Sequence, residues 1–117
     1  MNEKEFQAIL IEERDLLLER MTADLKYPMA ITTWDINNGH CDEFVEAVLH
    51  RGDVPDLWDV TSDWDKCEAD HIFLKWNEKF YDAECIEGVE DYHDLPIFKN
   101  QGKTREEVLN ERNQSIL

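Results

Sequence analysis

The fold of this chain depends most on residues 71–84, which have the sequence His71-Ile72-Phe73-Leu74-Lys75-Trp76-Asn77-Glu78-Lys79-Phe80-Tyr81-Asp82-Ala83-Glu84. Both flanks carry β-favouring residues and the middle is polar, which predicts a β-hairpin around residues 77–79. If Asn77 and Glu78 form a two-residue loop, His71 lies opposite Glu84 and diagonal to Asp82 on one face. A three-residue loop would separate these side chains onto opposite faces. The hairpin register therefore decides whether the imidazole meets a carboxylate.

A thiol lies upstream of the hairpin, at the predicted start of a helix. Cys41 follows the turn-forming run Asn37-Asn38-Gly39, and apolar residues then recur at helical intervals to about Arg51-Gly52. These apolar positions are Phe44, Val45, Val48 and Leu49. The acidic residues Asp42 and Glu43 complement the positive end of the helix dipole. This pattern predicts a helix with Cys41 in its first turn.

The remaining elements follow from periodicity and turn residues. Apolar residues at near-helical spacing predict a long amphipathic helix over residues 3–25, which Pro28 ends. The segment from Met29 to Trp34 is expected to be a short strand or an extended lead-in. Residues 53–70 predict an irregular or short-helical connection. Near the end of the chain, residues 96–98 suggest a short strand or a tether, and Thr104 with Glu107 predicts a capped helix to about Arg112.

Length and composition predict one domain. With 117 residues, of which 42% are hydrophobic, residues 1–117 suffice for a single core. The expected fold is α+β: a long N-terminal helix and the Cys41 helix packed on a small antiparallel sheet.

The net charge of −16 at pH 7 argues against direct binding to nucleic-acid phosphates. It indicates either a solvated surface or a mimic of nucleic acid. Three cysteines and no apolar signal-peptide core favour a reducing cytoplasm. No apolar run is long enough for a membrane span, so no membrane partner is expected.

A thiol, an imidazole and a carboxylate in this order suggest nucleophilic chemistry. A free cysteine is most often a buried packing residue. At a helix start and beside a base, however, its pKa falls and it becomes a nucleophile. Either Asn37 or Asn38 is a candidate to donate a side-chain N–H to an oxyanion, with the Cys41 backbone N–H as the second donor. On spacing alone, Glu84 competes with Asp82 as the carboxylate that orients His71.

The string His71-Ile72-Phe73-Leu74-Lys75-Trp76, followed by Phe80-Tyr81-Asp82-Ala83, resembles the small transglutaminase-like branch of the papain-like thiol fold. In that family an Asn/Gly-containing turn precedes the Cys helix, the His opens a strand, and a Trp/Tyr-Asp pair lies on its hairpin partner. The resemblance covers about residues 29–86. It implies that Cys41 is the nucleophile, His71 the general base and then acid, and Asp82 the orienting carboxylate. Asp42 occupies the position after the nucleophile, which is commonly aromatic in the family.

A metal site is the alternative use of these ligands. Cys67, His71, Cys85 and His93 are residue types that hold Zn²⁺, but only the first pair has familiar spacing, so no metal is expected. No phosphate-binding glycine loop occurs, and no cofactor is expected. The acidic residues between positions 84 and 94 match no calcium loop and indicate a solvated face.

The expected activity is acyl transfer through a thioester, by a peptidase, amidase or transglutaminase-like enzyme acting on a peptide or amide substrate. The acidic surface suggests that this substrate, or a protein partner, is basic. Two other hypotheses stay open. One is an acidic phage or mobile-element protein that inhibits a nucleic-acid-handling enzyme by charge mimicry. The other is a transglutaminase-like scaffold without activity that serves only for binding.

Overall fold

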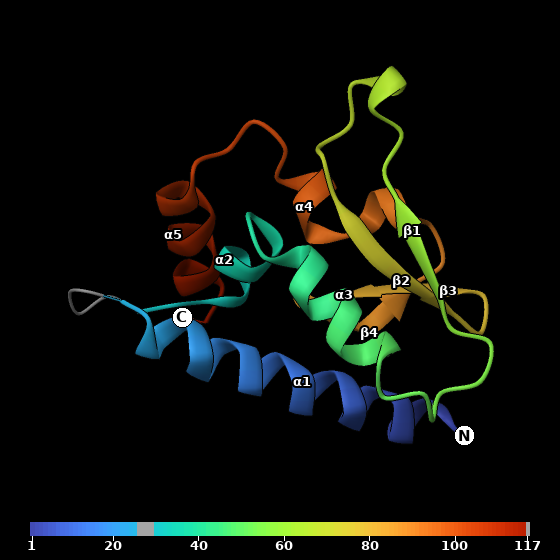
Figure 1. The fold of residues 1–117 in the computed structure, drawn as a ribbon. Helices are drawn as coiled ribbons and strands as arrows, with labels where there is room; N and C mark the ends of the chain where they lie inside the picture. The colour runs from blue at the N-terminus through green and yellow to red at the C-terminus, as the bar shows by residue number, and fades with distance from the viewer. Residues whose placement is uncertain (26–29, 117) are drawn as a thin grey trace.

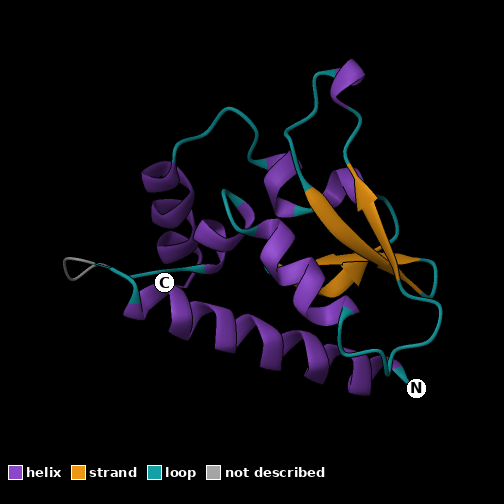
Figure 2. Ribbon diagram, in the orientation of Figure 1, coloured by secondary structure: helices purple, strands orange, loops and turns teal. Residues whose placement is uncertain are grey.

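The four strands form one antiparallel sheet in chain order, β1-β2-β3-β4 (Figure 1). The strands are β1 (Trp58–Thr61), β2 (Ile72–Trp76), β3 (Lys79–Asp82) and β4 (Cys85–Val89). The structure, a computed structural model, describes residues 1–25 and 30–116. Helices and sheet together make one α+β domain, as the composition predicts (Figure 2).

The predicted hairpin is confirmed, and of the two loop lengths left open by the sequence it has the two-residue loop. Trp76 pairs with Lys79, and Asn77 and Glu78 have φ values of 51° and 65°. Positive φ at both loop residues is typical of the type I′ turn, whose twist matches that of the flanking strands. The second strand, predicted to reach Glu84, ends at Asp82, because the chain turns at residues 83–84 into β4.

The outer strands β1 and β4 were not expected from the sequence. β1 lies in the segment predicted to be irregular, and Trp58 in it is 66% exposed. β4 lies among the acidic residues assigned to a solvated face. β1 has only four residues, and β4 lacks a regular alternation of apolar and polar residues, so pairing with the central hairpin specifies them more than local pattern does.

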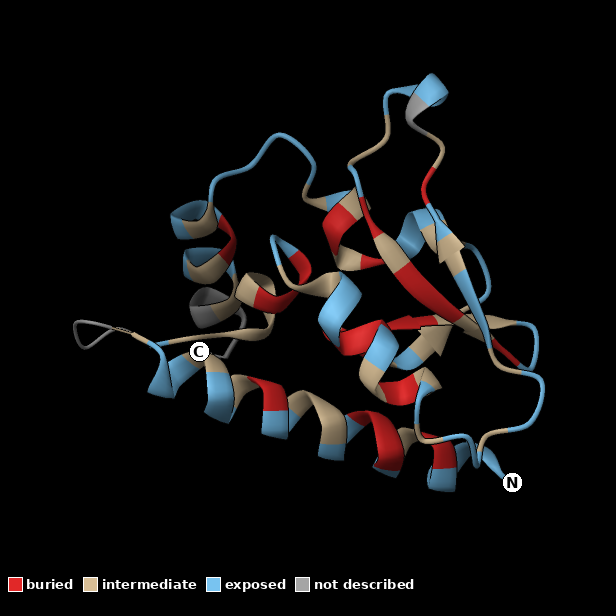
Figure 3. Ribbon diagram, in the orientation of Figure 1, coloured by how far each residue is buried: buried red, intermediate tan, exposed pale blue. Residues whose placement is uncertain are grey.

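The long N-terminal helix is confirmed as α1 (Glu3–Ala23), with Asn2 and Glu5 forming a capping box. It ends before the predicted position 25, and Pro28 and Met29 lie outside the described residues. One face of α1 is buried against α3 (Cys41–Leu49) and the sheet, whereas the opposite face is exposed (Figure 3). Helix α3 begins at Cys41 as predicted, and ends slightly before the expected Arg51-Gly52.

Three further α-helices, α2, α4 and α5, occur in the described part of the chain. Residues expected to be extended form α2 (Thr33–Asn37), because Asp35 accepts the Thr32 backbone N–H at 2.8 Å in a capping box. Pro96, expected in a strand or tether, instead occupies the first turn of α4 (Pro96–Lys99), where proline is tolerated. The predicted helix at Thr104 is α5 (Arg105–Ile116). Thr104 Oγ1 accepts the Glu107 backbone N–H at 3.2 Å.

Apolar side chains cover both faces of the sheet. The larger cluster joins α1 and α3 to one face and includes Phe6, Phe44, Leu74 and Tyr81. The smaller cluster packs Leu95 and Phe98, around α4, on Phe73. Among the described residues, no helix combines the length and apolarity needed to span a membrane.

Candidate active site

His71 lies immediately before β2, where hydrogen bonds hold both its backbone N–H and its backbone carbonyl. Its N–H donates to Ser62 Oγ at 3.0 Å, and its carbonyl accepts the Ser62 backbone N–H at 2.9 Å. Ser62 directly follows β1 and is 7% exposed. These two hydrogen bonds extend the β1–β2 pairing by one residue. They fix the position of the His71 backbone, to which the imidazole is attached.

The His71 imidazole is hydrogen-bonded to Asp82. His71 Nε2 lies 2.9 Å from Asp82 Oδ2, and the two side chains are 0% and 1% exposed. The second Asp82 oxygen, Oδ1, accepts the Glu84 backbone N–H at 2.9 Å. Because both carboxylate oxygens have partners, the Asp82 side chain holds one orientation of the ring.

Aromatic side chains cover the imidazole. The ring of His71 stacks on Phe73 with a centroid distance of 5.5 Å and meets Phe98 edge-on at 5.9 Å. The other ring nitrogen, Nδ1, is buried and has no hydrogen-bond partner among the described residues. Nδ1 is therefore the atom of His71 that is available to exchange a proton.

Cys41 lies at the first position of α3, partly exposed to solvent. Partial burial raises the pKa of its thiol, but the neighbouring His71 side chain and the backbone of Ile72 outweigh burial, so that the pKa lies below its ordinary value. The charge of Asp42 acts in the opposite direction and raises this pKa. The thiol and the imidazole thus lie close enough to shift each other's pKa, although they do not form a hydrogen bond of standard geometry.

The pKa of His71 moves in the matching direction. Burial alone would lower it, but the hydrogen bond to Asp82 and the neighbouring Cys41 raise it to about 9. A raised imidazole pKa beside a lowered thiol pKa favours the pair in which the proton has moved from Cys41 to His71. The directions of these two pKa shifts therefore favour a thiolate–imidazolium pair.

The two asparagines before Cys41 differ in their surroundings. Asn38 is exposed, and its Nδ2 donates to the Trp34 carbonyl at 2.9 Å at the end of α2. Asn37 is 2% exposed, and its Nδ2 has no hydrogen-bond partner among the described residues. A buried amide donor without a partner costs free energy unless something accepts it. Asn37 is therefore the better candidate for an oxyanion donor, whereas the side chain of Asn38 donates its hydrogen bond at the end of α2.

Glu84 is not the carboxylate that contacts His71. Its Oε2 instead pairs with Arg112 of α5 at 2.6 Å, with the Glu84 side chain 1% exposed. Burial raises the pKa of Glu84, although Arg112 lowers it in part. Of the two carboxylates that the hairpin spacing allows, the structure brings Asp82 to the imidazole and assigns Glu84 to an ion pair.

A cleft of about 550 Å³ opens over this site. Cys41 and His71 line it together with the buried Asn37. The loop before His71 forms another wall, which Gln101 fixes through hydrogen bonds of 2.8 Å to the Ala69 N–H and the Cys67 carbonyl. The remaining lining residues are Asn38, Gly39, Asp42, Thr61, Ala69, Asp70, Ile72 and Ile97.

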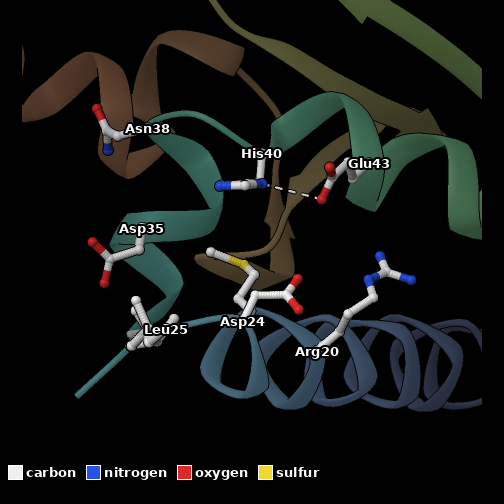
Figure 4. A pocket seen from close by; sticks show the side chains of 9 residues that line it. Arg20, Asp24, Leu25, Asp35, Asn38, His40 and Glu43 are labelled. Atoms are coloured by element: carbon white, nitrogen blue, oxygen red, sulfur yellow. Dashed lines mark hydrogen bonds and ion pairs between the residues drawn. The ribbon is translucent and has the colours of Figure 1, made fainter. Parts of the chain in front are cut away.

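A second cavity, of about 390 Å³, lies on the α1 side of the α2–α3 turn (Figure 4). Three of its ionisable side chains have partners within the chain: His40 and Glu43 pair with each other at 3.1 Å, and Asp35 pairs with Arg105 at 2.8 Å. Figure 4 shows His40 and Glu43 joined across the start of α3. Neither Cys41 nor His71 lines this cavity, so the candidate catalytic residues belong to the other cleft.

The other cysteines are separate from this site. Cys85 is buried in the sheet, where burial raises the pKa of its thiol to about 12, and Cys67 is exposed in the loop before His71. Within the described part of the chain, no group of three or more Cys, His, Asp or Glu side chains is arranged to hold a metal ion. His93 instead pairs with Glu68 at 2.6 Å and Asp91 at 2.9 Å.

The sequence pattern did not predict three residues that support the site: Ser62, Phe98 and Gln101. Each acts on the site from a segment remote in sequence, so no local spacing points to it. Only the β-like run Trp58-Asp59-Val60-Thr61 before Ser62 offers a signal, because a strand there would place Ser62 beside the start of the hairpin.

Comparison of the chain with protein-family models, with curated proteins and with solved structures found no match.

Proposed function

We propose that this protein is a thiol-dependent acyl-transfer enzyme in which Cys41, His71 and Asp82 act as nucleophile, base and orienting carboxylate. One observation carries the proposal: His71 Nε2 is hydrogen-bonded to the buried Asp82, Nδ1 has no partner among the described residues, and the His71 side chain lowers the pKa of Cys41. Asp82 selects the tautomer of neutral His71 that carries its proton on Nε2. The free lone pair on Nδ1 is then available to accept the Cys41 proton.

The reaction follows from this arrangement. Cys41 Sγ attacks the carbonyl carbon of an amide or ester while its proton resides on His71 Nδ1. The oxyanion that forms takes hydrogen bonds from Asn37 Nδ2 and the Cys41 backbone N–H. His71 returns the proton to the leaving group as the tetrahedral intermediate collapses to a thioester. Water or an amine then attacks the thioester and releases Cys41. The proposed family is the transglutaminase-like branch of the papain-like thiol fold.

The rate of Cys41 alkylation by iodoacetamide between pH 5 and 10 tests the proposal. Mass spectrometry follows each cysteine separately, so that the exposed Cys67 serves as an internal control. Labelling of Cys41 at pH 6–7 that is at least tenfold faster than labelling of Cys67, and is lost in His71→Ala, supports the pair. Slow labelling with an ordinary thiol profile contradicts it. That result would favour a binding role for the acidic surface, as a charge mimic or an inactive scaffold.

A further inference from the structure

The cleft is lined by two aspartates that are neighbours in sequence of the thiol and the imidazole. Asp42 follows Cys41 in α3, Asp70 precedes His71, and both aspartates line the cleft. Both are exposed, and neither makes a hydrogen bond or ion pair with another described residue. No lysine or arginine is among the described lining residues. The described lining of the cleft therefore presents two carboxylates with no lysine or arginine beside them, and its one basic side chain, His71, is already paired with Asp82.

A second feature indicates that this cleft receives a ligand. Asn37 lines the same cleft, and its buried Nδ2 has no hydrogen-bond partner in the part of the chain that the structure describes. A buried donor of this kind is normally satisfied by an acceptor, and a substrate carbonyl oxygen is an acceptor of the right type. The site thus offers a hydrogen-bond donor for an acyl oxygen beside two anionic groups.

We infer that the cleft takes acyl substrates with a positive charge near the reacting carbonyl, such as peptides with lysine or arginine at that position, and that Asp42 and Asp70 bind this charge. The inference rests on the proposed function, because it names the substrate class of the same site. Two carboxylates beside the acyl position attract a cationic side chain and repel an anionic one.

The same charge gives Asp42 a second effect. Its carboxylate raises the pKa of the Cys41 thiol and so opposes formation of the nucleophile. A cationic group bound at Asp42 offsets that charge and removes the opposition. By thermodynamic linkage, a substrate cation and the Cys41 thiolate favour each other. The thiol is then most nucleophilic when a cationic substrate occupies the cleft.

Methanethiosulfonate reagents test the charge of the cleft without a known substrate. Each reagent forms a disulfide with Cys41 Sγ and releases methanesulfinate. At low ionic strength the labelling rate of the trimethylammonium-ethyl reagent is divided by that of the sulfonatoethyl reagent. This ratio of rates should be roughly tenfold higher at Cys41 than at Cys67. Asp42→Asn and Asp70→Asn should each lower this ratio about threefold or more. Glu46→Gln, one turn after Asp42 on the same helix but outside the cleft lining, should leave it unchanged.

The neutral methyl reagent separates this role of Asp42 from a catalytic one. Asp42→Asn should react with it as fast as the unmodified protein or faster at pH 7, since a charge that opposes the thiolate is gone. A ratio at Cys41 that neither aspartate variant changes would overturn the inference.

Ester hydrolysis then distinguishes this inference from the proposed function. The p-nitrophenyl esters of acetyl-lysine, acetyl-norleucine and acetyl-glutamate should acylate Cys41 in that order of kcat/KM, each releasing p-nitrophenolate. Turnover that requires Cys41 but shows no preference for lysine would overturn the inference and leave the proposed function standing. If Cys41 supports no ester turnover and is alkylated no faster than Cys67, both the inference and the proposed function are overturned.

Discussion

His71 Nε2 and Asp82 Oδ2 lie 2.9 Å apart with both side chains withdrawn from solvent. A buried pair of this kind is rarely retained for stability alone, because desolvation of the two groups offsets much of their attraction. Here the pair leaves one ring nitrogen of His71, Nδ1, without a partner among the described residues, and the His71 side chain lowers the pKa of Cys41. The predictions below test what depends on that pairing.

Asp82→Asn should lower the reactivity of Cys41 towards iodoacetamide at pH 7 by tenfold or more. The amide keeps the shape of the carboxylate but not the charge that raises the pKa of His71, so that the imidazolium no longer favours the thiolate. Glu84→Gln is the matched control, since Glu84 pairs with Arg112 and not with His71. It should change the rate much less, and an equal loss in both variants would contradict the assignment of Asp82.

Removal of the Cys41 thiol should reveal how His71 makes the free energy of unfolding depend on pH. The pKa of His71 is raised from 6.5 to about 9, so folded protein retains a proton that unfolded protein loses between these values. This contribution is full below pH 6.5 and is lost as the pH rises, with a slope of at most about 1.4 kcal/mol per pH unit. The lowered pKa of Cys41 has the opposite effect, so the two partly cancel in the unmodified protein.

The free energy of unfolding of Cys41→Ala, measured by urea denaturation from pH 6 to 9.5, should therefore fall more steeply with pH than that of the unmodified protein. The steep range should end somewhat below pH 9, because Cys41 itself contributes to the raised pKa of His71. A further His71→Ala change should abolish the extra slope. Parallel curves for Cys41→Ala and the unmodified protein would show that the thiol and the imidazole do not interact.

Asn37→Ala should reduce turnover of a p-nitrophenyl ester roughly 100-fold or more while Cys41 is alkylated at an unchanged rate. Loss of one oxyanion donor affects the tetrahedral intermediate but not the attack of the thiolate on iodoacetamide. Asn38→Ala, which removes the hydrogen bond at the end of α2, should affect turnover far less. Equal effects of the two changes would indicate that Asn37 only supports the turn.

Gly88→Ala should destabilise the sheet beside the site by about 2 kcal/mol or more. Gly88 has φ of +78°, and a Cβ there would lie 2.5 Å from Cε1 of the buried Tyr81 ring. Gly52→Ala is the control for backbone strain alone, because φ is +71° but no atom lies within 4 Å of the added Cβ. Thermal or urea unfolding of both variants measures the difference, and equal losses would show that Tyr81 moves aside without cost.

The local pattern of the chain was sufficient for the elements that hold the candidate residues. Helical periodicity predicted α1 and α3, and the polar residues 77–79 between β-favouring flanks predicted the β2–β3 hairpin, whereas the loop length and so the register came from the structure. The start of α3 at Cys41 followed from the turn residues before it. These features depend on neighbours within a few positions, where propensity and hydrophobic period are informative.

Only the tertiary structure decided which side chains meet. Sequence spacing left Asp82 and Glu84 equivalent, and the ion pair of Glu84 with Arg112, 28 positions away, separates them. Asn37 and Asn38 were likewise interchangeable until burial of one and the Trp34 hydrogen bond of the other distinguished them. The outer strands and α4 also depend on packing against the central hairpin. The sequence by itself determined α1, α3, α5 and the hairpin, because their causes are local, whereas the partners of each polar group arise from contacts between remote segments.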